Sequence, residues 1–146
     1  MKIQDFFRDI PNFPKEGILF KDITPLLLNY EATKLCLDTL ASTVLNKKID
    51  KVIGVESRGF FFGILLAQKL NAGFVPVRKP KKLPYHTISE SYALEYGTDS
   101  LEIHTDAIQP GDRVLIHDEV LATGGTADAV GELVEPVGGG QVGLHL

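Results

Sequence analysis

Three short apolar runs set the strongest limit on how this chain can fold: KVIGVE (51–56), GFVPVR (73–78) and RVLIHDE (113–119). The first run is short, apolar and β-branched and suits a buried strand, the second predicts another short strand, and the third predicts a fully buried strand. The segment between the first two runs, RGFFFGILLAQKL (58–70), is long enough for a helix. Strand, helix and strand with tight joints form a βαβ unit with parallel strands. The prediction is an α/β fold with an open, mainly parallel, twisted sheet flanked by helices.

The segments around this unit predict further elements. Residues 1–30 carry prolines and aromatic residues at irregular spacing, which predicts a short helix followed by a loop-rich arm. Apolar residues recur at helical spacing from about residue 31 to residue 46 and predict a helix. The polar segment 79–97 is too long for a simple connection, so we expect a flexible lid loop with a function. The pattern of residues 100–108 predicts a strand, and a helix can begin at Gly125.

Length and composition limit the organisation of the chain and its partners. The 146 residues fit a single domain, 1–146, with an N-terminal arm or hood (1–30) and a core (31–146). A net charge of −4 gives no support for binding nucleic acid. No stretch resembles a membrane span or a signal peptide. The single cysteine, Cys36, excludes an internal disulfide, and a cytoplasmic location is expected.

Polar segments with unusual chemistry follow all three predicted strands. They are ESRGF after the first strand, RKPKKLP after the second and HDEVLATGGT at the third. Ligands of open parallel sheets bind at the carboxyl ends of the strands. We therefore expect the three segments to converge on one site, and this convergence is stronger evidence than any one segment.

The third segment predicts a phosphate site. Its small-residue turn, 122–126, leads into a helix N-terminus, where backbone N–H groups and the helix dipole favour an anion. It lacks the lysine of a Walker loop and the spacing of the dinucleotide fingerprint. Asp118 and Glu119 would repel a phosphate unless they reach sugar hydroxyls, directly or through a divalent cation. The alternative is a helix capped by Thr123, with two solvated acids at a strand end.

The other two segments offer positive charge. Arg58 could grip a phosphate with help from N–H groups near Ser57, or it could be a surface arginine behind a serine cap. Four basic residues after the second strand could bind a further anion or could form a solvated charged loop: Arg78, Lys79, Lys81 and Lys82. On the lid, Glu95 could exchange a proton with a substrate that Tyr96 covers. A plain half-exposed strand is as good an interpretation of these two residues.

These segments carry a family resemblance. VLIHDEVLATGGTA resembles the ribose-phosphate signature of type I phosphoribosyltransferases. IPNFPKEGILFKDITPLL, ESRGFFFG, VPVRKPKKLP and YALEYGTDSLEIHTDAIQPGDRVLI resemble the adenine phosphoribosyltransferase family, and the likeness runs from about Ile10 to Val134. The resemblance implies a homodimeric purine-salvage enzyme. With Mg²⁺ as cofactor, it would transfer the phosphoribosyl group of 5-phosphoribosyl 1-pyrophosphate to adenine, giving AMP and pyrophosphate.

The resemblance also implies roles for individual residues. Asp118 and Glu119 would contact the ribose hydroxyls, with at most water-mediated contacts to Mg²⁺, which the substrate would mainly hold. The 5′-phosphate would lie on Ala122, Thr123, Gly124, Gly125 and Thr126. Pyrophosphate would contact Ser57, Arg58, Lys79 and Lys82, some of them across a dimer interface. Adenine would meet Leu19 and Lys21 of the hood and Glu95 and Tyr96 of the lid, with Glu95 and Arg58 as catalytic residues.

Some residues depart from the family pattern. Lys81 stands where the family usually has glycine, and His117 replaces an aliphatic residue. Pro136 falls where the family has a helix, and family members continue beyond Leu146, so we expect a truncated or altered end with a frayed sheet edge. Two alternatives stay open: a 6-oxopurine phosphoribosyltransferase, and a non-catalytic regulator that binds 5-phosphoribosyl 1-pyrophosphate.

Overall fold

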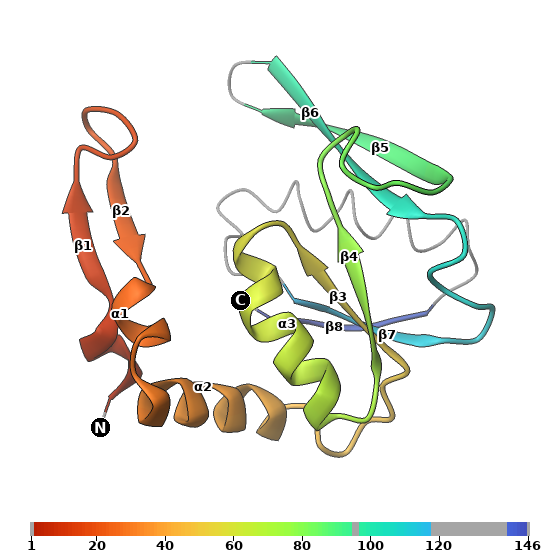
Figure 1. Cartoon of the computed structure of the whole chain (residues 1–146), viewed down its shortest axis with the longest axis horizontal. Helices are drawn as coiled ribbons and strands as arrows, with labels where there is room; N and C mark the ends of the chain where they lie inside the picture. Colours follow the sequence, from red (N-terminus) through yellow and green to blue (C-terminus); the bar gives the residue numbers. More distant parts are fainter. Residues whose placement is uncertain (1, 95–96, 118–139, 146) are drawn as a thin grey trace. The chain divides into compact units, whose positions relative to one another are not determined.

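The computed structural model describes residues 2–94, 97–117 and 140–145 (Figure 1). The chain divides into two compact units, Met1–Val44 and Leu45–Leu146. The first unit thus extends past residue 30, where the sequence placed the end of the arm, and includes the first long helix.

Helix α2 is the longest element of the N-terminal unit. In chain order this unit contains the 3-10 helix η1 (Ile3–Phe6), strands β1 (Arg8–Pro11) and β2 (Leu19–Asp22), and helices α1 (Thr24–Leu27) and α2 (Tyr30–Ser42). Asn29 caps α2, because its side chain accepts a hydrogen bond from the backbone N–H of Ala32 at 2.9 Å. The predicted helix of residues 31–46 is confirmed, although it ends at Ser42.

The prediction of a loop-rich arm is wrong for β1 and β2. The two strands pair antiparallel as a hairpin, from Arg8 opposite Asp22 to Pro11 opposite Leu19. Each strand has only four residues, and most of them are exposed, so no run of buried apolar residues marks either strand. The short helix expected before them is the 3-10 helix η1.

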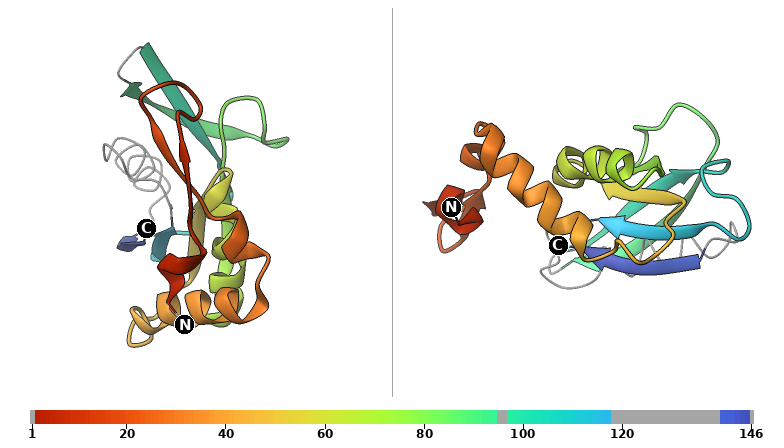
Figure 2. Two further views of the ribbon diagram at one scale, coloured as in Figure 1. Left: turned by 90° about the vertical axis from the view of Figure 1, so that its left-hand side faces the viewer. Right: turned by 90° about the horizontal axis from the view of Figure 1, so that it is seen from below.

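A four-stranded parallel sheet is the centre of the second unit. In chain order this unit contains β3 (Lys51–Val55), α3 (Arg58–Lys69), β4 (Gly73–Val77), β5 (Thr87–Leu94), β6 (Gly97–His104), β7 (Arg113–His117) and β8 (Gly140–His145). The strand order is β4-β3-β7-β8, and helix α3 lies against one face of the sheet (Figure 2). The predicted α/β fold with a mainly parallel sheet is confirmed.

Helix α3 packs closely on the sheet because small residues line the contact. A Cβ atom added to Gly54 of β3 would lie 2.6 Å from the ring of Phe74, and one added to Gly63 of α3 would lie 2.7 Å from the same ring. These separations are too short for carbon atoms, so the aromatic ring fits only beside glycine. The close approach places the start of α3 next to the carboxyl end of β3.

Part of the segment predicted as a lid loop, Thr87–Leu94, is a strand. β5 pairs antiparallel with β6 along its whole length, from Thr87 opposite His104 to Leu94 opposite Gly97. Leu101 and Ile103 of β6 are fully buried in the core of the sheet. The strand predicted at residues 100–108 therefore starts and ends earlier. The polar residues of β5 concealed it in the sequence, although Ile88 packs against the core.

β8 is the edge strand of the parallel sheet. It pairs with β7, with a register shift between Val114 and Leu115. Fraying of this edge stays a prediction, and the expected helix from Gly125 and the effect of Pro136 lie outside the described residues. Within the described ranges, no helix has the length and apolar character needed to cross a membrane.

Candidate active site

The carboxyl ends of β3 and β4 lie side by side, as the sequence predicted. The two strands pair in parallel up to Val55 and Val77, and the N–H of Glu56 donates to the carbonyl of Val77 at 3.0 Å. The segments that follow, 56–58 and 78–82, therefore leave the sheet at the same edge. This brings Ser57 and Arg58 into the neighbourhood of the basic residues.

Helix α3 begins at this edge. Ser57 occupies its N-cap position and is exposed, but its side chain makes no capping hydrogen bond. The alternative in which Ser57 serves as a helix cap is therefore not observed. Arg58 is the first residue of the helix and is half-buried. The hydroxyl and the N–H groups of the first helical turn can thus bind an anion beside the arginine.

The end of β7 also meets the start of α3. A Cβ atom on Gly59 would lie 2.9 Å from the carbonyl oxygen of His117, the last residue of β7. The backbones touch here because residue 59 has no side chain. The ends of β3, β4 and β7 therefore converge, as the three polar segments predicted. His117 is buried in the sheet and lies in register with His145 of β8.

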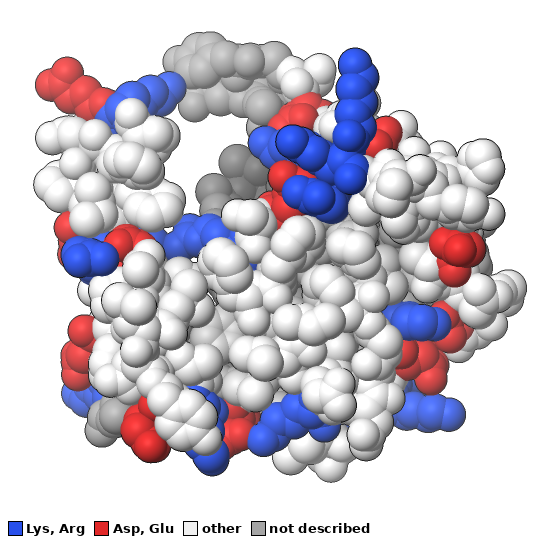
Figure 3. All heavy atoms as spheres, in the orientation of Figure 1, with Lys and Arg blue, Asp and Glu red and all other residues white. Residues whose placement is uncertain are grey.

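Arg78 is held by a carboxylate that the sequence interpretation missed. Its Nε donates to Oε1 of Glu56 at 3.0 Å, and its guanidinium lies over the ring of Phe60, 5.8 Å from the ring centroid. Basic and acidic side chains gather together where the chain leaves β4 (Figure 3). Arg78 is thus bound within the protein.

The lysines of residues 78–82, called the basic segment below, differ in the contacts that they make. The Nζ of Lys79 lies 3.3 Å from Oδ2 of Asp99, and its backbone N–H donates to Glu56 at 2.9 Å. The N–H of Lys81 donates to Oε1 of Glu102 at 3.1 Å. Lys82 is exposed, and its side chain forms no ion pair with the part of the chain that the structure describes.

Lys81 adopts a left-handed backbone conformation, with φ at 69°. Glycine reaches this region without steric cost, whereas a lysine does not. The resemblance implies glycine at this position, which the left-handed backbone explains. Lys81 therefore carries backbone strain that glycine would avoid.

The two hood residues lie on β2 in the N-terminal unit. Leu19 is 54% exposed, so its apolar side chain is available for contact with another group. Lys21 forms an ion pair with Asp9 across the hairpin.

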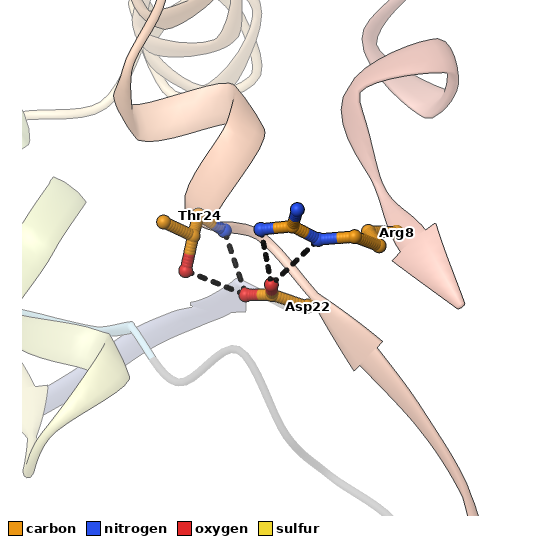
Figure 4. Close-up of polar contacts among 3 residues, drawn as sticks. All are labelled: Arg8, Asp22 and Thr24. Carbon is orange, nitrogen blue, oxygen red and sulfur yellow. Dashed lines mark hydrogen bonds and ion pairs between the residues drawn. The ribbon is translucent and has the colours of Figure 1, made fainter. Parts of the chain in front are cut away.

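Asp22, at the end of β2, links the hairpin to α1 (Figure 4). One carboxylate oxygen accepts from the N–H (2.9 Å) and the hydroxyl (2.6 Å) of Thr24, and the other from Nε (3.1 Å) and Nη2 (3.0 Å) of Arg8. The hydrogen bonds from Thr24, followed by those from Arg8, hold the pKa of Asp22 below its usual value.

Several predicted site residues lie outside the described residues. They are Glu95, Tyr96, Asp118, Glu119, Ala122, Thr123, Gly124, Gly125 and Thr126. Their roles stay predictions. Among the described residues, no three His, Cys, Asp or Glu side chains cluster in a way that could hold a metal ion.

The acids around the basic segment carry only a weak signal in the sequence. Glu56 directly precedes Ser57 and Arg58, and could have been noticed as a charge beside a predicted anion site. Asp99 and Glu102 belong to β6, and the antiparallel bridge between Arg78 and Glu102 brings this strand to residues 78–81. Their role depends on tertiary structure.

Comparison with known proteins identifies the class to which this fold and site belong. The model of the phosphoribosyl transferase domain matches residues 27–146. The chain belongs to the phosphoribosyltransferase family, and within it to the adenine phosphoribosyltransferases, which are transferases.

Three similar proteins illustrate this placement. The adenine phosphoribosyltransferase of Flavobacterium johnsoniae is 71% identical over 95% of this chain and 82% of its own length. The crystal structure of the Rhodothermus marinus enzyme is 56% identical with a TM-score of 0.93, over 98% of this chain and 81% of that one. The Saccharomyces cerevisiae enzyme, crystallised with adenine and an iminoaltritol bisphosphate, is 42% identical with a TM-score of 0.88, over 97% of this chain and 86% of that one.

Proposed function

We propose that this chain transfers the 5-phosphoribosyl group of 5-phosphoribosyl 1-pyrophosphate to adenine and releases AMP and pyrophosphate, as a step of purine salvage. One observation carries the proposal: the ends of β3, β4 and β7 converge and bring the start of α3 and a basic segment to the same edge of the sheet. Adenine in the structure of the yeast relative supports the choice of base.

The pyrophosphate half of the site is the better described. Ser57 and the first turn of α3 offer hydrogen-bond donors, and Arg58, Lys79 and Lys82 offer positive charge. As the bond from ribose C1 to pyrophosphate breaks, negative charge accumulates on the leaving group, and fixed cationic groups stabilise it. Lys79 must exchange its ion pair with Asp99 for one with the substrate.

The sugar-phosphate half follows β7 directly in the sequence. Asp118 and Glu119 would bind the ribose hydroxyls, and the turn of residues 122–126 would hold the 5′-phosphate through backbone N–H groups. The ribose ring acquires positive charge in an oxocarbenium-like transition state, as in glycoside cleavage. Two carboxylates close to the ring would favour that charge.

The base half rests on Glu95 and Tyr96, with Leu19 and Lys21 of the hood. Glu95 would accept or donate the ring proton of adenine while the base attacks C1 on the face opposite pyrophosphate. In the sequence Glu95 falls between β5 and β6, the two strands of a hairpin whose base contacts the basic segment. The hairpin would also exclude water, which would otherwise hydrolyse the activated sugar.

Mg²⁺ is the proposed cofactor. The carboxylates of Asp118 and Glu119 are the oxygen donors that Mg²⁺ prefers, and the ion typically keeps several waters and binds substrate phosphates. These residues would therefore hold the ion through water, with the substrate as its main ligand. When bound, Mg²⁺ would offset the charge of pyrophosphate.

A cytoplasmic homodimer is the proposed setting. One face of α3 supports self-association, because Phe61, Ile64 and Leu65 are 43%, 54% and 40% exposed. Helical spacing places these three apolar side chains on a common stripe.

A base-panel assay tests the function. The purified chain, 5-phosphoribosyl 1-pyrophosphate and Mg²⁺ are incubated with adenine, hypoxanthine, guanine or xanthine, and the nucleotide is identified by chromatography. We expect AMP only. Conversion of hypoxanthine in place of adenine would favour the 6-oxopurine alternative, and binding without turnover would favour the regulator.

Two variants test the roles of site residues. Glu95→Gln should lower kcat about 100-fold, because it removes a proton-transfer group. Glu90→Gln makes the same change on an exposed residue of the same hairpin and should leave turnover unchanged. Arg58→Gln should lower kcat/KM for 5-phosphoribosyl 1-pyrophosphate about 100-fold. Equal rates for Glu95→Gln and Glu90→Gln would remove the role of Glu95.

A further inference from the structure

Glu56 places a carboxylate at the centre of the positively charged edge. It directly follows β3, and its side chain is 15% exposed. A single oxygen, Oε1, accepts two hydrogen bonds from the segment that follows β4: Nε of Arg78 at 3.0 Å and the backbone N–H of Lys79 at 2.9 Å. One side chain thus joins the ends of two neighbouring strands.

A negative charge here opposes the binding of an anion unless it is offset. Arg78 offsets it, and the ring of Phe60 supports the other side of the guanidinium at 5.8 Å. The Glu56–Arg78 pair is therefore neutral as a whole, and Arg78 is committed to the protein. The net positive charge of the basic segment comes from its lysines.

The backbone of the basic segment is held as well. The N–H of Lys79 is bonded to Glu56, Pro80 has no N–H, and the N–H of Lys81 is bonded to Glu102. Arg78 and Glu102 also exchange backbone hydrogen bonds at 3.0 and 2.7 Å. Backbone donors at residues 78–81 are therefore already in use, so an anion beside these residues depends on side chains, among them the lysines, whose positions follow the course of the loop.

We propose that Glu56 is a positioning residue for pyrophosphate: it fixes the path of residues 78–82 beside Ser57 and Arg58, so that Lys79 and Lys82 meet the leaving group. This inference rests on the proposed function. Glu56 itself contacts no substrate, and its contribution passes through the backbone of Lys79 and the side chain of Arg78.

The test is steady-state kinetics of Glu56→Ala and Glu56→Gln, with Glu90→Gln as the matched control. The alanine variant loses both acceptor contacts, so KM for 5-phosphoribosyl 1-pyrophosphate should rise about tenfold, the equivalent of one hydrogen bond to a charged group. Both kcat and KM for adenine should stay within about twofold of the wild type. The glutamine variant keeps an oxygen for Lys79 and should show a rise of about threefold.

The direction of the change separates positioning from simple repulsion. Loss of a negative charge beside an anion site would by itself lower KM for the anion. An unchanged or lowered KM in a folded Glu56→Ala variant would therefore overturn the proposal. So would a parallel loss in kcat and in KM for both substrates together with a lower melting temperature, since that is a general structural effect. If the alanine variant does not fold, the glutamine variant decides by the same criteria.

Calorimetry with inorganic pyrophosphate separates this inference from the function on which it rests. The wild type should bind pyrophosphate, and Glu56→Ala should bind it about tenfold more weakly. A wild type that turns over adenine, with equal pyrophosphate affinity in both proteins, would overturn the role of Glu56 alone. A wild type that neither turns over adenine nor binds pyrophosphate would overturn the proposed function, and this inference with it.

Discussion

Strands are held together in two different ways in the parallel sheet and in the N-terminal hairpin. β3 lies between β4 and β7, and four of its five residues are buried. Among the described strands, β1 and β2 form a sheet of their own; they are mostly exposed and are joined by the ion pairs Arg8–Asp22 and Lys21–Asp9. Burial of apolar side chains involves no charge and is not screened by salt, whereas exposed ion pairs contribute little and are screened. The sheet should therefore carry the stability, and the hairpin should respond to the solvent.

Cavity formation in the sheet unit should have the largest effect. Leu66 of α3 is completely buried against the sheet, and Leu66→Ala should lower the free energy of unfolding by about 2–5 kcal/mol. Leu45→Ala is the matched control, because Leu45 is 66% exposed and its truncation should cost less than about 0.5 kcal/mol. Denaturant unfolding at low and high salt measures both. Equal losses, or a loss for Leu66→Ala that depends on salt, would break the comparison.

A charged pair inside the sheet unit should have an intermediate effect. Nζ of Lys51 lies 2.8 Å from Oδ2 of Asp112, which also accepts from the N–H of Gln109 at 2.8 Å, and the carboxylate is only 15% exposed. Asp112→Asn should cost about 1–2 kcal/mol at neutral pH, because it weakens hydrogen bonds to a charged group. Asp106→Asn changes an exposed carboxylate of the same loop and should cost almost nothing.

The pH dependence of this pair follows from the sign of its shift. The hydrogen bond from Lys51, followed by that from Gln109, lowers the pKa of Asp112 from its ordinary value of 3.8. The stabilisation is therefore complete above pH 3.8 and is lost as the pH falls through the lower pKa of the folded state. Acid unfolding of Asp112→Asn should lack this part of the transition. Identical acid transitions in wild type and variant would show that the pair contributes nothing.

The contrast between burial and exposure also explains what the sequence could predict. The runs that became β3 and β7 were found because strands buried on both faces are continuously apolar, and β4 was found as a short apolar run although only Val75 and Val77 are buried. β1, β2 and β5 were missed because they are short or polar, and their partners are chosen by turns and register.

Some residues of the candidate site could likewise be predicted from the sequence, and others could not. Ser57, Arg58 and the basic residues were predictable, because they directly follow buried strands and such ends converge in a parallel sheet. The acids that hold the basic segment were not, because Asp99 and Glu102 reach it through a tertiary pairing of β6 with Arg78. In the structure Asp99 contacts Lys79, and Glu102 accepts from the N–H of Lys81.

A smaller gain in stability is expected at Lys81. Its φ of 69° is unfavourable for a side chain with a Cβ atom, so Lys81→Gly should stabilise the protein by about 0.5–1 kcal/mol. Lys82→Gly is the matched control: Lys82 lies outside the left-handed region, and glycine there should destabilise slightly. Thermal unfolding compares the two. A loss of stability in Lys81→Gly would show that the ammonium group matters more than the backbone.

The smallest effect on stability is expected in the N-terminal hairpin, where the signal of a single N–H group can follow the titration of Asp22. The N–H of Thr24 donates to Asp22, so its NMR chemical shift should report the titration of that carboxylate, with a midpoint below 3.8. The lowered pKa means that the contact stabilises the hairpin above pH 3.8 and is lost as the pH falls through the folded-state value. The hydroxyl bond of Thr24 is the largest single cause, and alanine keeps the N–H, so Thr24→Ala should raise the midpoint more than Arg8→Ala, and 1 M salt should remove mainly the Arg8 contribution. The reverse order would mean that the ion pair, and not the hydrogen-bonded turn into α1, holds the end of β2. The hairpin would then depend on charge more strongly than its exposed position allows.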